Sequence, residues 1–593
     1  MKALVLIHYY KVFKEHAGKK LPTLILIVVF TGLLEGLGIS MFIPLLSEGN
    51  VTSADQYAVS GILYGILSFF GISPDFTPVL LFILGVFLLR GVLQLGSQAL
   101  SAHITATLTR NLRENLVSLL MRTNYPNFLR MDTGFLANLV TKESDRAVAS
   151  FNHYANTLAS LVHVGVYGAV CMMISWRVAF ILGVLGLVTI VMLGFVHRLS
   201  HDYSVRTTKH NASLEELLIQ TIQFFKYLKA TNSFPQLKKK LDAEIRTLAD
   251  FVFRLGVISG GLKSVTEPLG VVVVVALLYV NVSMLGQPVS GTLLIVFLLY
   301  RTMNKFMSAQ NLWQKFNSAV GGLEEITRTF NRMGGEIEEE GPHKVANFQE
   351  AIELKNLDFF YERRQVLFDI NMSFPKNKTV ALVGRTGSGK STIANLIMGV
   401  EPPASGKILF DGISYHGLNK ASLRKLLGYV TQESVLFNDS IANNISFWSC
   451  SDADPECLWK VTAAARAVHC DEFIEKTDHG YLTLLGDWGS TISGGQRQQI
   501  CIARELFKEP EILILDEAMS ALDAHSESLI QKSLAELQGS RTIIIITHRL
   551  ATVKACDYVY VLDEGRIVEE GTYQYLSQKG DSRFFELARL QSL

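Results

Sequence analysis

The segment 384–392 combines the residue types needed to hold a polyphosphate. It follows an apolar, strand-like run at 379–383 and precedes a helix-like run from Ile393 to Met398. Glycines let the loop backbone bend so that its N–H groups converge on one point, toward which the helix also directs its positive dipole end. The Lys390 ammonium would reach the β- and γ-phosphates, and the Ser391 hydroxyl would ligate Mg²⁺. The predicted phosphate-binding residues are Gly384, Arg385, Thr386, Gly387, Ser388, Gly389, Lys390, Ser391 and Thr392.

Two adjacent carboxylates end the apolar run 512–515. Acidic groups beside a buried strand are costly to desolvate unless they have a role. Asp516 could bind Mg²⁺ through water, and Glu517 could polarise an attacking water. Gln432 and His548 each follow another strand-like run, from which they could reach the metal-bound water and the γ-phosphate.

Three further segments could complete a nucleotide site. Ile492–Gln498 is a serine- and glycine-rich turn before a helix, so it offers a second anion cradle. The run Ser520-Ala521-Leu522-Asp523 follows the carboxylate pair. Tyr361, upstream of the phosphate loop, is a candidate platform for a purine, although a single aromatic is as often a packing residue. The cradle residues are Ser493, Gly494, Gly495 and Gln496.

The composition divides the chain of 593 residues, which is longer than one domain usually is. Long apolar runs extend to about residue 318, whereas charged residues, short strands and turns alternate from Val345 onward. A formal net charge of +1 provides no basic footprint, so no nucleic-acid partner is predicted. The 6 cysteines lack metal-ligand spacing and are predicted to be reduced thiols, which suits the cytosol.

The apolar part predicts an all-α polytopic membrane domain. Residues 1–20 are apolar and basic without a cleavage site, which is typical of an interfacial helix. Basic residues near the N-terminus and in 103–150, against an acidic 47–76 loop, place both chain ends in the cytoplasm. The runs long enough to span a bilayer are 21–46, 77–102, 152–176, 178–199, 255–284 and 290–316.

The connections between these spans are unequal. The outer 47–76 loop contains apolar residues that predict an amphipathic helix lying in the headgroup region. The inner connections stay helical over long stretches and are predicted to project into the cytoplasm, turning at 125–127 and 230–232. The acidic run 336–340 predicts a solvated linker.

In this order the motifs resemble those of the ABC transporter ATPases, and the whole chain is similar to an ABC exporter half-transporter. The resemblance implies an α/β P-loop ATPase and ATP held between the phosphate loop of one subunit and the cradle at Ser493 of another, hence a dimer. It also implies adenine stacking by Tyr361, nucleotide sensing by Gln432, a cross-subunit contact by Asp523 and a γ-phosphate switch at His548. The predicted domains are 1–20, 21–330, a 331–345 linker and 346–593.

Two departures from the family pattern concern the same region. Ile492 stands where leucine is usual, which is a packing change. Trp488, in Gly486-Asp487-Trp488-Gly489, replaces the usual arginine. The contact that this arginine usually makes with the helical extensions of the membrane domain is therefore in doubt. The other motif residues are intact, so a homodimer would have two competent sites, and a different partner chain stays open.

The cargo is the open question. The segment 34–44 and the outer helix look like the first span of exporters that flip lipid-linked oligosaccharides. The predicted function is therefore an ATP-driven flippase for an amphipathic, lipid-linked anionic substrate in the cytoplasmic membrane. The alternatives are a general exporter of lipids, drugs or peptides, an ATP-gated channel, and a non-transporting ABC ATPase.

Charged residues inside the spans can be explained by two hypotheses, one structural and one functional. Arginine at the bilayer centre costs at least about 2.5–3.5 kcal/mol, so such residues seldom persist without a partner. In the structural hypothesis Glu35 pairs with Arg90, and Glu267 pairs with Lys263 or Arg301. In the functional hypothesis the two arginines grip an anionic headgroup through their bidentate forks.

Overall fold

The computed structural model describes residues 8–14, 18–42, 58–73, 75–174, 203, 206–207, 209–211, 213–279, 283, 289–334, 337–338, 340–450, 454–486, 489, 491–519, 524–579 and 582–591. They form two compact units, each considered separately below. The helical unit comprises Met1–Met121 and Asp132–Gly334, and the sheet unit comprises Arg122–Met131 and Gly335–Leu593.

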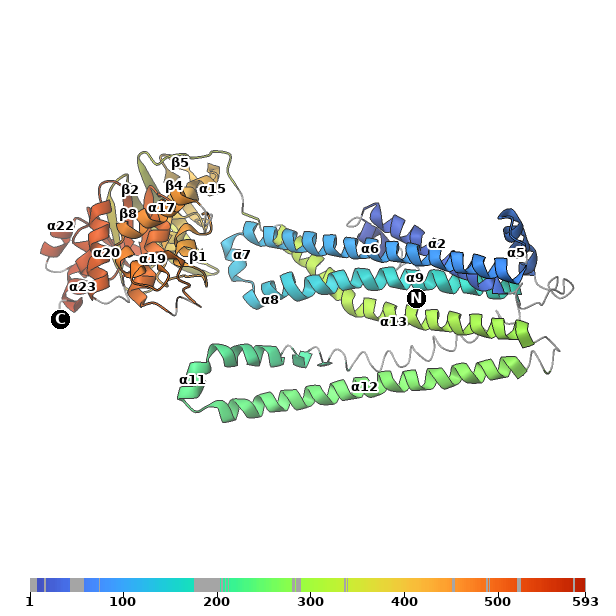
Figure 1. Cartoon of the computed structure of the whole chain (residues 1–593). Helices are drawn as coiled ribbons and strands as arrows, with labels where there is room; N and C mark the ends of the chain where they lie inside the picture. The colour runs from blue at the N-terminus through green and yellow to red at the C-terminus, as the bar shows by residue number, and fades with distance from the viewer. Residues whose placement is uncertain are drawn as a thin grey trace. The chain divides into compact units, whose positions relative to one another are not determined.

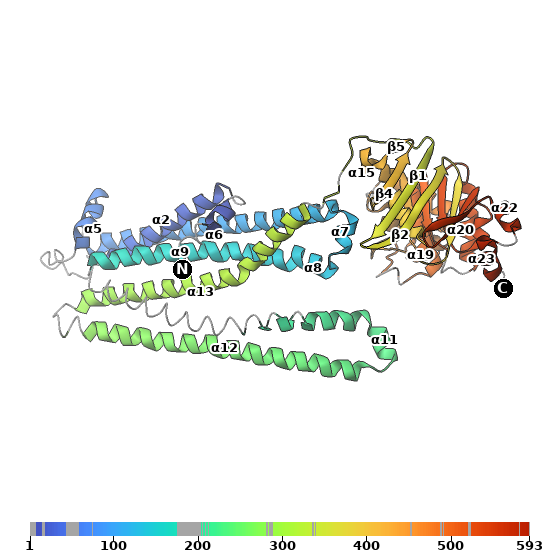
Figure 2. The ribbon, with the colours of Figure 1, turned by 180° about the vertical axis from the view of Figure 1, so that it is seen from behind.

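The helical unit consists of long helices that run side by side (Figures 1 and 2). Both α2 and α13 pack along α9, and α12 contacts α13. The helices are α2 (Lys20–Ser40), α5 (Ala58–Phe69), α6 (Phe76–Arg122), α8 (Thr133–Asn138), α9 (Ser144–Ile174), α11 (Phe225–Ala230), α12 (Phe234–Leu278) and α13 (Val289–Gly334), with a π-helical turn at Leu139–Glu143.

Three stretches of described helix are long and apolar enough to cross a membrane. They are Lys20–Ser40, Phe76–Arg122 and Gly134–Met173, with mean hydropathies of 2.0, 2.3 and 1.3. They contain most of the first three predicted spans, and α12 and α13 contain most of the fifth and all of the sixth. The predicted span 178–199 lies outside the described residues.

The two predicted peripheral helices pack against the bundle. Residues 8–14 are helical, and Phe13 is buried with its ring 5.4 Å from that of Phe151 on α9. The predicted outer helix is α5, whose Leu63 and Leu67 are buried while Phe69 is exposed. One face of α5 therefore packs on the bundle, because Leu63 and Leu67 lie one helical turn apart.

Both predicted turning points of the inner connections are confirmed. The first is α7 (Tyr125–Leu129), where the Asn124 side chain accepts a hydrogen bond from the Asn127 N–H at 3.1 Å. Pro126 lies in the first turn of α7, where its missing N–H is not needed. At the second, α11 ends at Ala230 and Asn232 has φ 53°. Asn tolerates this left-handed conformation, so the chain can reverse into α12.

The prediction of a solvated acidic linker is wrong at Glu338. Its carboxylate accepts hydrogen bonds from Arg424 at 2.8 and 2.5 Å, and Lys420 lies 3.5 Å away. The Glu338 N–H donates to the carbonyl of Arg122 at 2.9 Å. Two cations converge on this one acid, so the segment at Glu338 is held by contacts within the sheet unit, which also contains Arg122.

The sheet unit is built on two β-sheets. A mostly parallel sheet has the order β10-β9-β3-β8-β7-β6, and an antiparallel sheet has the order β2-β1-β4-β5. The strands are β1 (Ala351–Tyr361), β2 (Arg364–Pro375), β3 (Thr379–Gly384), β4 (Ser405–Phe410), β5 (Ile413–Ser414), β6 (Leu427–Val430), β7 (Ile512–Asp516), β8 (Thr542–Ile546), β9 (Tyr558–Asp563) and β10 (Arg566–Gly571). The parallel strands β3, β7 and β8 are continuous apolar runs because both of their faces are buried.

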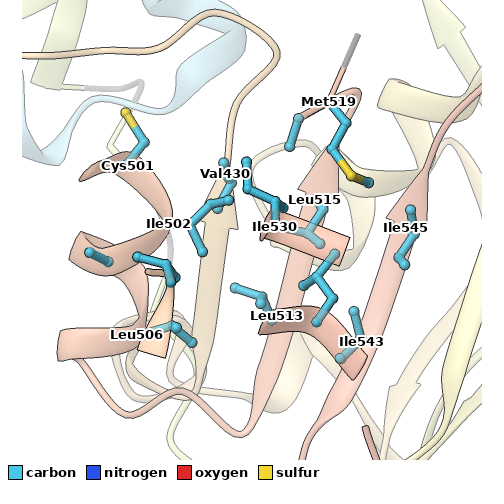
Figure 3. Close-up of a cluster of buried hydrophobic side chains, with 14 of the residues drawn as sticks. Val430, Cys501, Ile502, Leu506, Leu513, Leu515, Met519, Ile530, Ile543 and Ile545 are labelled. Atoms are coloured by element: carbon cyan, nitrogen blue, oxygen red, sulfur yellow. The ribbon is translucent and has the colours of Figure 1, made fainter. Parts of the chain in front are cut away.

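The sheet unit also contains the helices named below, several of which pack on the sheets. Figure 3 shows side chains of α19 facing those of β6, β7 and β8 in one buried cluster. Besides α7, they are α14 (Lys390–Ile397), α15 (Lys420–Lys425), α16 (Ile441–Ser446), α17 (Pro455–Ala467), α18 (Asp471–Glu475), α19 (Gly494–Phe507), α20 (Ala524–Leu537), α21 (Leu550–Val553), α22 (Tyr573–Gln578) and α23 (Arg583–Gln591), with 3₁₀ turns at Tyr415–Gly417 and Gly480–Leu482.

The prediction that all cysteines are reduced thiols is wrong for Cys450 and Cys457. The connection between α16 and α17 brings their Cα atoms within 5.6 Å, and a disulfide joins them. This separation suits a disulfide. The other cysteines are free and buried: Cys171, Cys470, Cys501 and Cys556.

Candidate functional site

The predicted phosphate loop joins β3 to α14. Gly387 and Gly389 have φ values of 83° and 100°, in the region that side chains rarely adopt. A Cβ at Gly389 would stand 2.5 Å from Cδ2 of Leu367. The positive φ, more than this contact with the end of a flexible side chain, requires glycine here and lets the loop bend.

The polar groups of the loop fit a polyphosphate. The ammonium of Lys390 donates to the carbonyls of Gly384 and Arg385, both at 2.9 Å, and so lies folded over the loop. Burial lowers the pKa of Lys390, against the opposing charges of Glu517 and Asp516. The Ser388 hydroxyl is buried and, within the described part of the chain, has no hydrogen-bond partner. A buried ammonium beside an orphaned hydroxyl is a donor set that an anion would satisfy.

The end of β7 places Asp516 opposite the loop. Its carboxylate accepts hydrogen bonds from the Ser391 hydroxyl at 3.2 Å and from the Tyr429 hydroxyl at 3.3 Å. Burial raises the pKa of Asp516, while these two hydrogen bonds act in the opposite direction. Hydroxyl and carboxylate oxygens suit Mg²⁺, a hard cation that keeps water in its shell.

Glu517 lies at the centre of the remaining predicted residues. The Gln432 side chain donates to its Oε2 at 2.9 Å, and Nδ1 of His548 lies 3.7 Å from its Oε1. The structure therefore brings Gln432, Glu517 and His548 together. Glu517 also has φ 47°, a strained conformation for a glutamate, which the hydrogen bond from its N–H to the carbonyl of Ile546 at 2.9 Å helps to hold.

Tyr361 lies at the end of β1 beside Thr392 of α14. Tyr361 is 38% exposed, and its hydroxyl donates to Glu401 at 3.1 Å. Burial raises the pKa of Glu401, and the hydrogen bond from Tyr361 opposes the rise. The ring is thus held at its edge while part of it stays open, an arrangement suited to stacking on a base.

Comparisons with known proteins match both units. A family described as "ABC transporter" matches residues 367–520, and "ABC transporter transmembrane region" matches residues 22–305. The ATP-dependent lipid A-core flippase of Haemophilus influenzae (strain 86-028NP) is 32% identical over 555 residues, covering 90% of this chain and 92% of that protein. The chain belongs to the ABC transporter family. Hydrolysis of ATP coupled to transport is accordingly its activity.

Two further proteins are similar to the chain, one in sequence and one in fold. The heterocyst differentiation ATP-binding protein HepA of Nostoc sp. is 32% identical over 470 residues, covering 78% of this chain and 75% of that protein. A bacterial Atm1-family ABC exporter solved with ATP bound has a TM-score of 0.75 at 22% identity and covers 98% of this chain and 99% of that chain. The predicted fold, a helical ABC exporter membrane domain followed by an α/β ATPase, is confirmed.

The turn predicted to be the ABC signature begins α19. Ser493 caps the helix by accepting a hydrogen bond from the Gln496 N–H at 3.2 Å, and the Gln496 side chain accepts one from the Ser493 N–H at 2.9 Å. This reciprocal pair fixes the first turn, in which Gly494 and Gly495 carry no side chain that would cover the N–H groups. Asp523 and Trp488 lie outside the described residues, so their predicted roles stay predictions.

The predicted intramembrane charges meet at Glu35 of α2, which is fully buried. Its carboxylate contacts Arg90 of α6 at 2.8 Å and Arg301 of α13 at 2.7 Å. Nε2 of His163 on α9 lies 3.4 Å away. The predicted Glu35–Arg90 pair is therefore present. Arg301 also reaches Glu35. The predicted pairing of Glu267 with Lys263 or Arg301 stays a prediction, because the side chains of Glu267 and Lys263 lie outside the described residues.

Sequence reasoning missed three partners of these residues. Tyr429 contacts Asp516, Glu401 holds Tyr361, and His163 lies beside Glu35. A polar residue next to a motif, or a single histidine in an apolar span, was the available signal. Each is a weak signal, because the contact depends on segments far apart in the chain.

Proposed function

We propose that two copies of this chain form a homodimeric flippase that uses ATP to move an amphipathic, lipid-linked anionic substrate, such as a lipid-linked oligosaccharide or glycolipid, across the cytoplasmic membrane. Several relatives are named lipid A-core flippases, which supports a lipid-type cargo. The basic residues flanking the inner ends of the spans support placing both termini and the ATPase in the cytoplasm.

The observation that carries the anionic cargo is the charge balance around Glu35. One buried carboxylate faces two guanidinium groups, so the Glu35–Arg90–Arg301 cluster keeps a formal excess of one positive charge. The Arg301 side chain is 38% exposed, whereas Glu35 is fully buried. A guanidinium that is only partly enclosed retains donors for a phosphate. Glu35 thus holds the arginines in place, and the surplus charge favours an anionic headgroup.

The sheet unit would bind and hydrolyse the ATP that drives transport, and its own side chains would do so as follows. Lys390 and Ser388 would hold the phosphates, and Ser391 and Asp516 would hold Mg²⁺, which when bound neutralises charge that develops on the phosphates. Glu517 would accept a proton from the attacking water, with Gln432 and His548 orienting it. The cradle at Ser493 would close over the nucleotide of the other subunit, and alternating access would follow from closing and reopening the dimer.

The cargo can be tested on protein purified in native lipid. Co-purifying lipids would be identified by mass spectrometry, and each would be tested for stimulation of ATP hydrolysis. We expect anionic lipid-linked species to be enriched and to stimulate. Stimulation by neutral amphiphiles alone would favour a general exporter, and ATP-dependent conductance without accumulation of cargo would favour a channel.

The arginines give a second, independent test. If they serve the cargo, Arg90→Ala and Arg301→Ala should hydrolyse ATP at the basal rate but lose stimulation and translocation. If they only hold the helices, both variants should lose thermal stability, and Glu35→Gln, which leaves both guanidinium groups without their acid, should be the least stable of the three variants. Undiminished cargo stimulation and translocation in Arg301→Ala would contradict the anionic-headgroup role.

A further inference from the structure

The connection between α16 and α17 contains a pair of bonded cysteines. Cys450 and Cys457 are 7 positions apart in the sequence, and both are half-buried. All other described cysteines are buried and free. Disulfides in the cytosol, where we place the sheet unit, are usually transient or redox-sensing rather than structural. A half-exposed bond in such a domain is open to exchange with soluble thiols.

The chain entering this connection holds a buried arginine of α19. Arg504 donates to the carbonyl of Asn444 at 2.6 Å, to the side chain of Asn444 at 2.9 Å and to the carbonyl of Val435 at 2.7 Å. Its guanidinium also lies 5.6 Å from the ring of Phe437 and 5.8 Å from that of Phe447. These contacts fix α19 to the segment that continues directly to Cys450.

The other end of the connection also reaches α19. Cys457 lies in the first turn of α17, and α17 packs on α19 next to α16. Trp448, between Phe447 and Cys450, donates to Asp439 at 2.6 Å and so fixes the start of the connection. The disulfide therefore links α16 and α17, both of which contact the helix capped by the signature residue Ser493.

We propose that Cys450 and Cys457 form a reversible redox site that sets the rate of ATP hydrolysis. In oxidation, the thiolate of one cysteine attacks a low-molecular-weight disulfide such as oxidised glutathione and releases one thiol. The second cysteine then attacks the mixed disulfide and releases another thiol. Two protein thiols are oxidised, two soluble thiols are formed, and they receive the two protons.

The other cysteines of the sheet unit do not compete in this reaction. The thiolate is the reactive form of cysteine. Burial raises the pKa of Cys470 and of Cys501, and it raises the pKa of Cys556 to about 12. These three therefore stay protonated at neutral pH, and the exchange is confined to the pair.

The bonded form is expected to be the faster enzyme. With the bond intact, Phe447 and Asn444 are held against Arg504, and the signature turn keeps a fixed orientation for its nucleotide. Reduction frees the connection from α17 and lets the segment that holds Arg504 move. Coupling between two sites is commonly worth about fivefold or more in equilibrium terms, so we expect reduction to lower turnover by about that factor.

The test uses the full-length protein in lipid nanodiscs equilibrated in glutathione buffers of graded ratio. Differential alkylation and peptide mass spectrometry would measure the Cys450–Cys457 bond, and ATP hydrolysis would be measured in the same samples. Turnover should follow the bonded fraction and recover on re-oxidation. Cys450→Ser and Cys457→Ser should each hydrolyse ATP at the reduced rate in every buffer, and the double variant should be no slower. Cys556→Ser is the matched control, which should keep the full redox response.

Three outcomes would overturn the proposal. The first is a bond that excess thiol leaves intact, which would make it a fixed structural link. The second is a pair that stays reduced in the most oxidising buffer. The third is turnover that is unchanged or higher after reduction of the wild-type protein, a comparison that needs no substitution and so does not depend on the folding of a variant.

Discussion

The strained backbone conformation of Glu517 follows from its position directly after β7 and beside the end of β8. Its φ of 47° is uncommon for a residue with a side chain, and such conformations cost about 1–3 kcal/mol. The surrounding structure maintains it through the N–H bond to Ile546 and the side-chain bond from Gln432. The strain directs the carboxylate toward Gln432 and His548 instead of along β7, which is the geometry needed to reach a water.

Replacing this carboxylate should separate binding from hydrolysis. Glu517→Gln keeps the size and the backbone but removes the base, so steady-state hydrolysis should fall about 10²–10⁴-fold. Nucleotide binding, measured by equilibrium titration, should stay near wild type. Glu564→Gln is a matched control, because Glu564 has the same φ of 47° and is exposed. Hydrolysis by Glu517→Gln at the rate of that control would contradict the role.

The hydrogen bond from Tyr361 to Glu401 should affect affinity for ATP more than catalysis. Tyr361→Phe keeps the ring but loses a bond to a buried acid, and one hydrogen bond is worth about 1 kcal/mol, so KM for ATP should rise about fivefold. The value of kcat should stay the same. Glu401→Gln retains an acceptor, so its KM for ATP should lie between those of the wild type and Tyr361→Phe. Tyr575→Phe, at an exposed position, should leave KM unchanged. An unchanged KM in Tyr361→Phe would refute the role of this contact.

At the scale of elements, local signals predicted more than distant ones. The strand, glycine loop and helix around Lys390 were predictable because the backbone conformations of Gly387 and Gly389 require those residues. The two turning points were predictable from Pro126 and Asn232 for the same kind of reason. The double pairing of Glu35 and the attachment of Glu338 were not, since each depends on where separate segments meet. The Cys450–Cys457 bond joins residues only 7 positions apart, and it was missed because cysteines of cytosolic domains are ordinarily reduced.

The contact between Glu338 and Arg424 should stabilise the exit from α13 in a pH-dependent way. Burial by itself raises the pKa of Glu338. The hydrogen bonds and charge of Arg424 and the charge of Lys420 outweigh burial and hold this pKa below its ordinary value. The stabilisation is therefore complete above the pKa of an unfolded glutamate, about 4.3, and is lost as the pH falls through the folded value. Since the Arg424 side chain is 36% exposed, we expect about 1 kcal/mol.

Hydrogen exchange measures this local stability directly. Glu338→Gln should speed exchange of the Glu338 amide, which bonds to Arg122, by about fivefold at neutral pH. The difference from wild type should shrink near pH 4 after correction for intrinsic rates. Glu350→Gln, at an exposed position, is the control. Equal protection of the wild type and the Glu338→Gln variant at neutral pH would show that the ion pair contributes nothing.

At the scale of the whole molecule, the proposed dimer predicts a particular pattern among mixed dimers. If each site joins the loop of one subunit to the signature turn of the other, Lys390→Ala and Ser493→Arg on opposite subunits leave one site intact. The same two substitutions on a single subunit damage both sites. Hydrolysis by purified heterodimers should therefore be about half of wild type in the first arrangement and absent in the second. Subunits that work alone would give the reverse order.

The cluster at Glu35 also has a consequence for how the chain is made. The carboxylate enters the membrane first, Arg90 follows 55 residues later, and Arg301 follows 266 residues after Glu35. An unpaired acid in the bilayer is costly, so the hairpin of α2 and α6 gains a neutral pair early in synthesis. Arg301 then arrives at a carboxylate that already has a partner. The surplus cation is thus acquired only when α13 is inserted, and a ribosome-bound chain that ends before α13 would expose a balanced, uncharged cluster to the lipid.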